Sequence, residues 1–167
     1  PQVDDAFIDA HVWAEGTPCG SDPEQIPVWY RMTGDDLQAV INWQSSRQAQ
    51  PTTGAFRLDL VFNGEGTTGI YSPDTLTPAA VANQGLFKWI NHTFTHDNLD
   101  NADYNKASSE ISQNDRTAQD LGFTTYSTQN LVTPDVSGLD NPQVMQAAFD
   151  AGVRYVVSDS SRPGYVN

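Results

Sequence analysis

Apolar and polar residues follow two different spacings along this chain, and these spacings divide it into predicted strands and helices. Apolar residues at every second position over 56–64 predict a strand that ends at Asn63 and Gly64. Short apolar stretches bounded by polar, Gly or Pro residues predict further extended segments at 6–13, 86–91 and 153–161.

Helical spacing and capping residues mark the segments between these strands. Thr33, followed three residues later by Asp36, predicts a helix start, and Pro78 fits the first turn of a second helix capped by Thr77. Gly152 is placed to end the last helix. The predicted helices cover 33–44, 77–84, 104–121 and 141–152.

Strands that alternate with helices through short Gly-containing joints predict an α/β fold. The expected architecture is a mainly parallel sheet covered by helices. Reactive residues in such folds gather at the carboxyl edge of the sheet, where strands end and loops begin. No internal repeat, linker or low-complexity tract interrupts the pattern.

The composition fits one globular domain with an acidic surface. The chain has 167 residues, of which 38% are apolar and 17% charged. Its formal net charge of −13 disfavours nucleic acid as a partner, because phosphate backbones would be repelled. No apolar run approaches the roughly 18 residues of a membrane-spanning helix. Cys19 is the single cysteine, so no disulfide forms within the chain.

Polar residues with chemical potential stand at three of the predicted strand ends: Asp4 and Asp5, then His92 and His96, then Asp159. One carboxylate and two imidazoles form a ligand set that zinc accepts, with a position left for water. A spacing of four residues favours this reading, since one helical turn brings two rings to the same face. Thr93 follows the first histidine, so this is not the Glu-containing helix motif of zinc proteases, and Asp4 is the candidate base.

Each of these features also has an ordinary structural interpretation. Two histidines four residues apart are common without a metal, and acidic pairs are mostly solvated turns or helix caps. His11 lies in an apolar segment and is interpreted as structural. Asn63 is interpreted as a turn residue, with substrate binding as the alternative. Trp13 and Tyr71 are candidates for stacking on sugar rings, although a core role is equally open for Trp13.

Taken together and in order, these pieces resemble the polysaccharide deacetylase (NodB-homology) superfamily. The resemblance rests on "VDD" at 3–5, "HTFTH" at 92–96 and the loop "VTPDVSGL" at 132–139, followed by a helix and a strand. With "FNG" and "SDSSRPG", the set is most similar to the branch of fungal galactosaminogalactan deacetylases, carbohydrate esterase family eighteen.

The resemblance implies a partial or distorted (β/α) barrel that removes acetyl groups from an N-acetylaminosugar polymer. By this resemblance Asp4 is the catalytic base, and Asp5, His92 and His96 hold a divalent metal, expected to be zinc. The implied reaction is attack of a metal-activated water on the acetyl carbonyl. The expected substrate is an exopolysaccharide containing N-acetylgalactosamine or N-acetylglucosamine.

The third and fourth motifs are less complete. Backbone N–H groups around Val136 and Ser137 are the implied donors to the oxyanion, and Asp159 falls where the family has its fourth motif. The third motif lacks the family's Arg, and Val136 replaces an aromatic residue. The family's last strand, with its catalytic histidine, is not found.

These departures lead to two expectations. Residues 1–167 are expected to be one deacetylase domain, incomplete at both ends, from a longer extracellular or cell-surface protein. The alternative function is a non-catalytic carbohydrate-binding or cell-surface domain that keeps the fold. The presence of Asp4 favours the enzyme, because a domain that binds metal without catalysing a reaction does not need a base.

Overall fold

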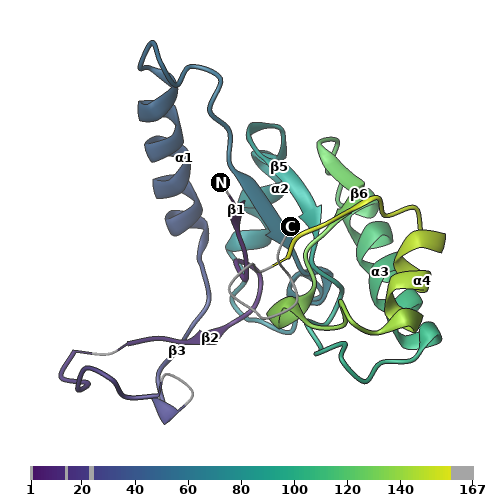
Figure 1. Cartoon of the computed structure of the whole chain (residues 1–167). Coiled ribbons are helices and arrows are strands. Elements are labelled where there is room, and N and C mark those ends of the chain that lie inside the picture. Colours follow the sequence, from purple (N-terminus) through teal and green to yellow (C-terminus); the bar gives the residue numbers. More distant parts are fainter. Residues whose placement is uncertain (1, 14, 23–24, 159–167) are drawn as a thin grey trace.

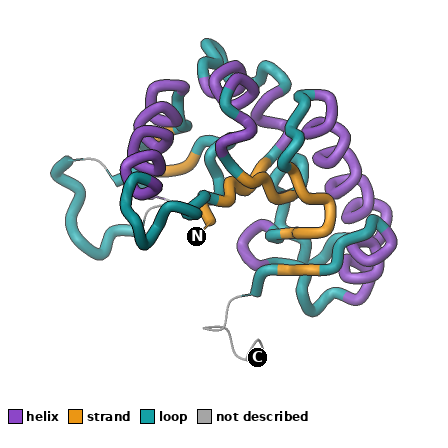
Figure 2. The backbone as a smooth tube through the Cα atoms, turned by 90° about the horizontal axis from the view of Figure 1, so that it is seen from above, coloured by secondary structure: helices purple, strands orange, loops and turns teal. Residues whose placement is uncertain are grey.

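The computed structural model describes residues 2–13, 15–22 and 25–158, which form a curved parallel sheet with helices along its outer side (Figures 1 and 2). The sheet has five strands in the order β1-β4-β5-β6-β7, and all neighbouring pairs are parallel. Its strands are β1 Gln2–Val3, β4 Asp59–Phe62, β5 Lys88–Asn91, β6 Tyr126–Leu131 and β7 Tyr155–Val156.

The helices follow the strands as the alternating pattern predicts. They are α1 Gly34–Gln48, α2 Leu76–Ala82, α3 Tyr104–Asp120 and α4 Pro142–Asp150, with short 3-10 turns at Gly64–Thr67, Gln84–Leu86 and Pro134–Val136. Figure 2 shows the strands along an arc with helices outside it, a curled half-barrel. The predicted α/β class and partial barrel are therefore confirmed. Within the described ranges, no helix is both long and apolar enough to cross a membrane.

Helix α1 begins with the predicted capping box and runs further than predicted. The Thr33 hydroxyl accepts from the Asp36 N–H, and the Asp36 carboxylate accepts from the Thr33 N–H. The predicted end was Gln44, but the helix continues to Gln48, and Gln44 is a buried residue within it. The Gln44 side chain accepts from the Leu58 N–H (2.7 Å) and donates to the Leu86 carbonyl (2.9 Å), which joins α1 to the sheet.

Helix α2 starts two residues earlier than predicted, because its N-cap residue is Thr75 and not Thr77. Asp74 accepts hydrogen bonds from the backbone N–H groups of Leu76 (3.0 Å) and Thr77 (3.1 Å). Asp74 therefore satisfies the first donors of the helix, and Thr77 lies within the first turn rather than capping it.

The predicted strand over 6–13 is mostly wrong. Ala6 and Phe7 lie in a turn after β1, where they fill the core. Only Ala10–His11 (β2) is extended, and it pairs antiparallel with Trp29–Tyr30 (β3) in a separate two-stranded ribbon (Figure 1). The apolar residues of this segment thus reflect a packed turn, not a strand.

Aromatic residues form the centre of the core between the sheet and its helices. Trp89 on β5 is fully buried and stacks on Phe123, with ring centroids 4.3 Å apart. Phe7 packs edge-on against Phe62 of β4, with centroids 5.0 Å apart. Because Phe7 is two residues after Asp5, the packed core also fixes the loop that carries this carboxylate.

Candidate metal centre and adjoining pocket

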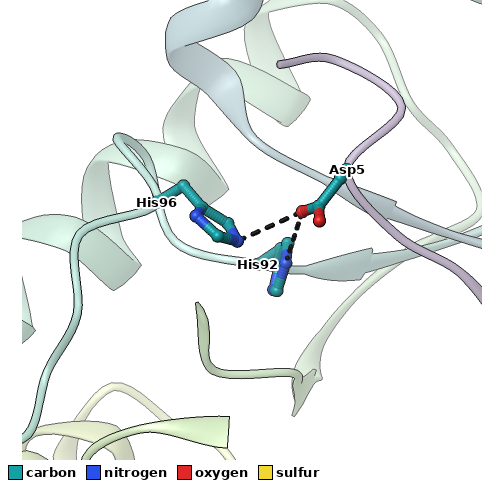
Figure 3. Close-up of side chains that lie close together, drawn as sticks. All are labelled: Asp5, His92 and His96. Atoms are coloured by element: carbon teal, nitrogen blue, oxygen red, sulfur yellow. Dashed lines mark hydrogen bonds and ion pairs between the residues drawn. The ribbon is translucent and has the colours of Figure 1, made fainter. Parts of the chain in front are cut away.

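Asp5, His92 and His96 lie together at the carboxyl edge of the sheet (Figure 3). The Oδ1 atom of Asp5 is 3.2 Å from Nε2 of His92 and 3.1 Å from Nε2 of His96. One ligand atom from each residue lies within 4.8 Å of the others. Asp5 follows β1 and His92 follows β5, so the parallel sheet joins residues 87 positions apart.

The two histidines meet through a loop and not through the predicted helical turn. Thr93 and His96 have φ values of 63° and 64°, and α3 begins only at Tyr104. Non-glycine residues rarely adopt positive φ, so the surrounding structure has to hold this loop in place. The two imidazole centroids lie 4.8 Å apart with their planes at 71°.

Glu110, a buried residue of α3, holds the loop between the histidines. Its Oε2 atom accepts from the backbone N–H groups of Phe94 and Thr95, each at 2.9 Å. Its Oε1 atom accepts from the Thr95 hydroxyl at 2.8 Å and from Lys106 at 2.7 Å. A carboxylate with four such donors is well satisfied in a site with little solvent.

Asn91, at the end of β5, connects the same loop to helix α3. Its Oδ1 atom accepts from the Thr93 N–H at 2.8 Å and from the Asn114 amide at 2.9 Å. Asn114 in turn accepts from the Gly64 N–H and donates to the Phe62 carbonyl, both at 2.7 Å. The ends of β4 and β5 are thereby set in register by one buried pair of amides.

Asn63 has a structural role that differs from both earlier interpretations. Its backbone is extended (φ −111°, ψ 114°), so it is not itself a turn residue. Its side chain is fully buried and donates to the carbonyl oxygens of His92 (2.7 Å) and Thr93 (3.2 Å). Asn63 therefore supports the backbone of the histidine loop from inside the protein and does not face a substrate.

The orientation of His92 is set by its second ring nitrogen. The Nδ1 atom lies 2.7 Å from the carbonyl oxygen of Val132, which only accepts, so Nδ1 carries a proton. Nε2 is then the ring nitrogen that faces Asp5, and it is the atom through which His92 would bind a metal ion. Two such nitrogens and one carboxylate oxygen fit a divalent cation with a further position for water.

Contacts within the cluster shift the pKa values of Asp5 and His96. Hydrogen bonds from His92 and then His96 hold the pKa of Asp5 well below its usual range, against the opposing effect of burial. Burial by itself lowers the pKa of His96, but the hydrogen bond to Asp5 and the charges of Asp5, Asp135 and Asp4 raise it. Asp4, which is exposed, is therefore within electrostatic reach of the site.

A pocket of about 280 Å³ opens beside Asp5 and His96. Besides these two, the side chains that matter for its chemistry are Asp9, His11, Trp29 and Asp135. The interpretation of His11 as only structural is incomplete, and Trp29 and Asp135 were missed. The signal for Trp29 was a tryptophan-tyrosine pair inside a loop rich in Gly and Pro, where no core strand was expected.

The predicted oxyanion donors are engaged within their own turn. The Val136 N–H donates to the Thr133 carbonyl (3.2 Å), and the Ser137 N–H donates to the Pro134 carbonyl (2.8 Å). The Ser137 hydroxyl accepts from the Leu99 N–H at 2.9 Å. In this conformation both N–H groups already have acceptors, so donation to an oxyanion would need this turn to change shape, and the assignment of an oxyanion donor around Val136 and Ser137 stays a prediction.

Three further expectations have different outcomes. Asp159 lies outside the described residues. One face of the Tyr71 ring is covered by the Arg31 guanidinium, 4.4 Å from the ring centre, and its hydroxyl donates to Asp9 (2.7 Å), so stacking of a sugar on Tyr71 stays a prediction for the other face. Trp13 is half-exposed, which rules out a core role.

Comparison with protein families identifies the chain. Residues 74–167, more than half of the sequence, match the family model of the Agd3 deacetylase domain. The chain belongs to this family. The matched part contains His92 and His96, whereas Asp4 and Asp5 precede it. No match was found among curated protein sequences.

Solved structures of the Agd3 and family 4 esterase type share the fold. Agd3, described as a novel carbohydrate deacetylase, aligns with a TM-score of 0.83 and 21% identity over 99% of this chain and 32% of its own. A family 4 pseudoenzyme from Bacillus anthracis aligns with a TM-score of 0.58 and 11% identity, over 77% of this chain and 40% of its own. The Streptomyces lividans family 4 carbohydrate esterase, in complex with acetate, aligns with a TM-score of 0.50 and 18% identity, over 73% of this chain and 55% of its own. These alignments confirm the resemblance to NodB-type polysaccharide deacetylases at the level of fold, and the chain spans about a third of the Agd3 chain.

Proposed function

We propose that this chain carries the active site of a metal-dependent carbohydrate deacetylase. Its substrate would be an exopolysaccharide that contains N-acetylgalactosamine or N-acetylglucosamine, at the cell surface or outside the cell. The observation that carries the proposal is the meeting of Asp5, His92 and His96 beside a pocket that Asp5 and His96 line, with Asp4 next to Asp5 in the sequence. Membership of the Agd3 deacetylase domain family supports it.

Asp5, His92 and His96 are the residues that would hold the cation. Zinc suits two imidazoles and a carboxylate, although other divalent metals also accept this set. When bound, such an ion activates water and polarises a carbonyl group. The contact between Nδ1 of His92 and the Val132 carbonyl keeps Nε2 available in advance, so little rearrangement is needed for binding.

Asp4 is the proposed base. It is exposed and directly precedes Asp5, and its charge acts on His96. In the proposed hydrolysis the Asp4 carboxylate takes a proton from water as the water oxygen bonds to the acetyl carbon. The carbon-nitrogen bond then breaks, and the nitrogen gains the proton that Asp4 took from the water. The products are acetate and a free amine on the sugar.

The charge of the pocket also suits this reaction. Carboxylates of Asp5, Asp9 and Asp135 line it, and the net charge of the chain is −13. A neutral acetamido sugar enters such a site without repulsion, whereas a sulfated or uronic acid polymer would be repelled. The amine product is a cation at neutral pH and would be retained more strongly at low salt.

A non-catalytic carbohydrate-binding domain is the second candidate. One observation favours it: the N–H groups of Val136 and Ser137 are occupied within their own turn, so the predicted oxyanion donors are not available in this conformation. The loss of one such donor typically reduces the rate of acyl-transfer enzymes by about 100- to 1,000-fold.

The decisive experiment combines metal analysis with measurement of acetate release. Zinc-loaded protein is incubated with N-acetylated galactosamine or glucosamine oligomers, and Asp4→Asn is compared with Asp35→Asn, an exposed control on α1. We expect Asp4→Asn to keep its metal and to lose at least about 100-fold in rate, with the control unchanged. Equal rates in Asp4→Asn and the parent protein would remove Asp4 as the base. Stoichiometric metal without acetate release from the parent protein would favour the binding domain.

A further inference from the structure

Trp29 and His11 form one wall of the pocket that contains Asp5 and His96. They are directly opposite each other in the antiparallel pair of β2 and β3, so their side chains lie on the same face of the ribbon. Their ring centroids are 3.7 Å apart, with the planes inclined at 41°. The imidazole thus supports one side of the indole.

Trp29 is too exposed to be a core residue. It keeps 57% of its surface accessible, whereas Trp89 in the core keeps none. Large aromatic side chains left open beside a polar pocket usually contact a ligand or partner. Trp43 is exposed to a similar degree but lies on α1, where it borders a separate apolar groove with Val3 and Val40.

The ribbon is firmly attached to the body of the protein at the end next to Trp29. Arg31, two residues further on, donates to the carbonyl oxygens of Phe7 (3.0 Å) and Gly66 (2.8 Å) and pairs with Asp74 (3.0 Å). On the other strand, Nδ1 of His11 donates to the Ile26 carbonyl. Trp29 therefore stands on a pre-organised support, which reduces the entropy lost when a ligand binds.

We propose that Trp29, backed by His11, is the stacking platform for the sugar ring whose acetamido group reaches Asp5 and His96. A pyranose ring has an apolar face of C–H groups that matches a flat indole, and its hydroxyls are donors for the carboxylates of Asp9 and Asp135 on the pocket wall. A volume of about 280 Å³ has room for one such ring. The identity of the sugar as an N-acetylated aminosugar rests on the proposed function.

The test compares Trp29→Leu, Trp29→Phe and the control Trp43→Leu. Acetate release from an N-acetylated galactosamine or glucosamine oligomer gives KM and kcat, and metal content is measured in parallel. We expect Trp29→Leu to raise KM about tenfold with kcat and metal content nearly unchanged. Trp29→Phe should recover most of the loss because it restores a flat ring, and Trp43→Leu should leave KM unchanged. Unaltered KM in Trp29→Leu, or a lower kcat and metal content without a change in KM, overturns the platform.

A binding measurement separates this proposal from the deacetylase proposal. The same substitutions are made in zinc-loaded Asp4→Asn protein, and the oligomer is titrated by calorimetry. Binding about tenfold weaker with Trp29→Leu than with Trp43→Leu supports the platform, even if the parent protein releases no acetate. Equal binding by both variants overturns the platform, even if the parent protein is an active deacetylase.

Discussion

The side-chain amide of Asn114 on α3 donates to Oδ1 of Asn91 at the end of β5 across 2.9 Å, with both residues fully buried. The same Oδ1 atom receives the N–H of Thr93, the residue of positive φ that follows His92. The helix behind the sheet therefore controls the loop that carries both histidines, although it contributes no ligand.

Replacing Asn114 should destabilise the fold. Asn114→Ala removes the acceptor of the buried Gly64 N–H, while the Phe62 carbonyl and Oδ1 of Asn91 each keep one of two donors. A buried donor left unpaired costs about 1 to 3 kcal/mol, so a loss of at least about 1 kcal/mol is expected in urea unfolding. The exposed neighbour Gln113→Ala should change stability by less than about 0.5 kcal/mol. A similar effect of both substitutions would contradict this role.

Glu110 should control metal affinity without touching the metal. Glu110→Ala removes the acceptor of the Phe94 and Thr95 N–H groups, so His96 is no longer held in its positive-φ conformation. Loss of groups that orient metal ligands typically weakens binding about 10- to 100-fold, and we expect a change of this size in zinc calorimetry. Glu110→Gln, which keeps one acceptor oxygen, should be less affected. Unchanged affinity in Glu110→Ala would show that the loop holds its shape by other contacts.

The pair of Arg31 and Asp74 should make stability depend on pH at the acidic end. Burial by itself raises the pKa of Asp74, but hydrogen bonds from Thr77 and the contact with Arg31 outweigh it and lower the pKa below 3.8. A carboxylate with a depressed pKa stabilises the fold above its unfolded value and loses that contribution as pH falls through the folded value.

Asp74→Asn should therefore be less stable than the parent protein at pH 7, by about 3 kcal/mol for a mostly buried pair. This difference should shrink below about pH 4, because the parent carboxylate is then protonated as well. Urea unfolding at pH 7 and pH 3 measures both values, with exposed Asp35→Asn as the control. A difference that stays constant with pH would mean that the charge of Asp74 contributes nothing.

Gly66 should tolerate no side chain. A Cβ atom at this position would lie 2.0 Å from the carbonyl oxygen of Phe7. This oxygen belongs to the backbone, so it can shift only if the loop that carries Asp5 shifts as well. Gly66→Ala is expected to lower the unfolding free energy by more than about 2 kcal/mol and to weaken zinc binding. Gly85→Ala, where nothing lies within 4 Å of the added atom, is the matched control. Equal thermal stability of the two variants would refute the clash.

The cluster of Asp5, His92 and His96 was partly predictable. Parallel strands place their carboxyl ends at one edge of a sheet, which locates His92 because it follows the predicted strand at 86–91. The strand predicted at 6–13 begins after Asp5, so the place of Asp5 in the cluster followed from the resemblance to deacetylases. The path between His92 and His96 was not predictable. Their spacing fits a helical turn, and only contacts from Glu110 and Asn63, distant in sequence, select the loop instead.

The pocket wall was hidden from sequence reasoning for a different reason. His11 and Trp29 are separated by a loop without a recognisable hairpin turn, so no local signal fixes their pairing. Asn63 shows the converse. A polar residue after an apolar strand usually belongs to a turn. The Asn63 side chain is instead buried and donates to the backbone carbonyl of His92, which is distant in sequence and comes close only in the folded protein.

Strand β1 contributes two residues to the sheet, and β4 separates it from β5. A cation held by Asp5 on one side and by the histidines on the other would connect the ends of β1 and β5 across β4. Binding of the cation should therefore stabilise the pairing of β1 with β4, and loss of that pairing should weaken binding. Amide hydrogen exchange at Val3 should consequently slow on addition of zinc, while exchange in the distant helix α4 stays at its original rate.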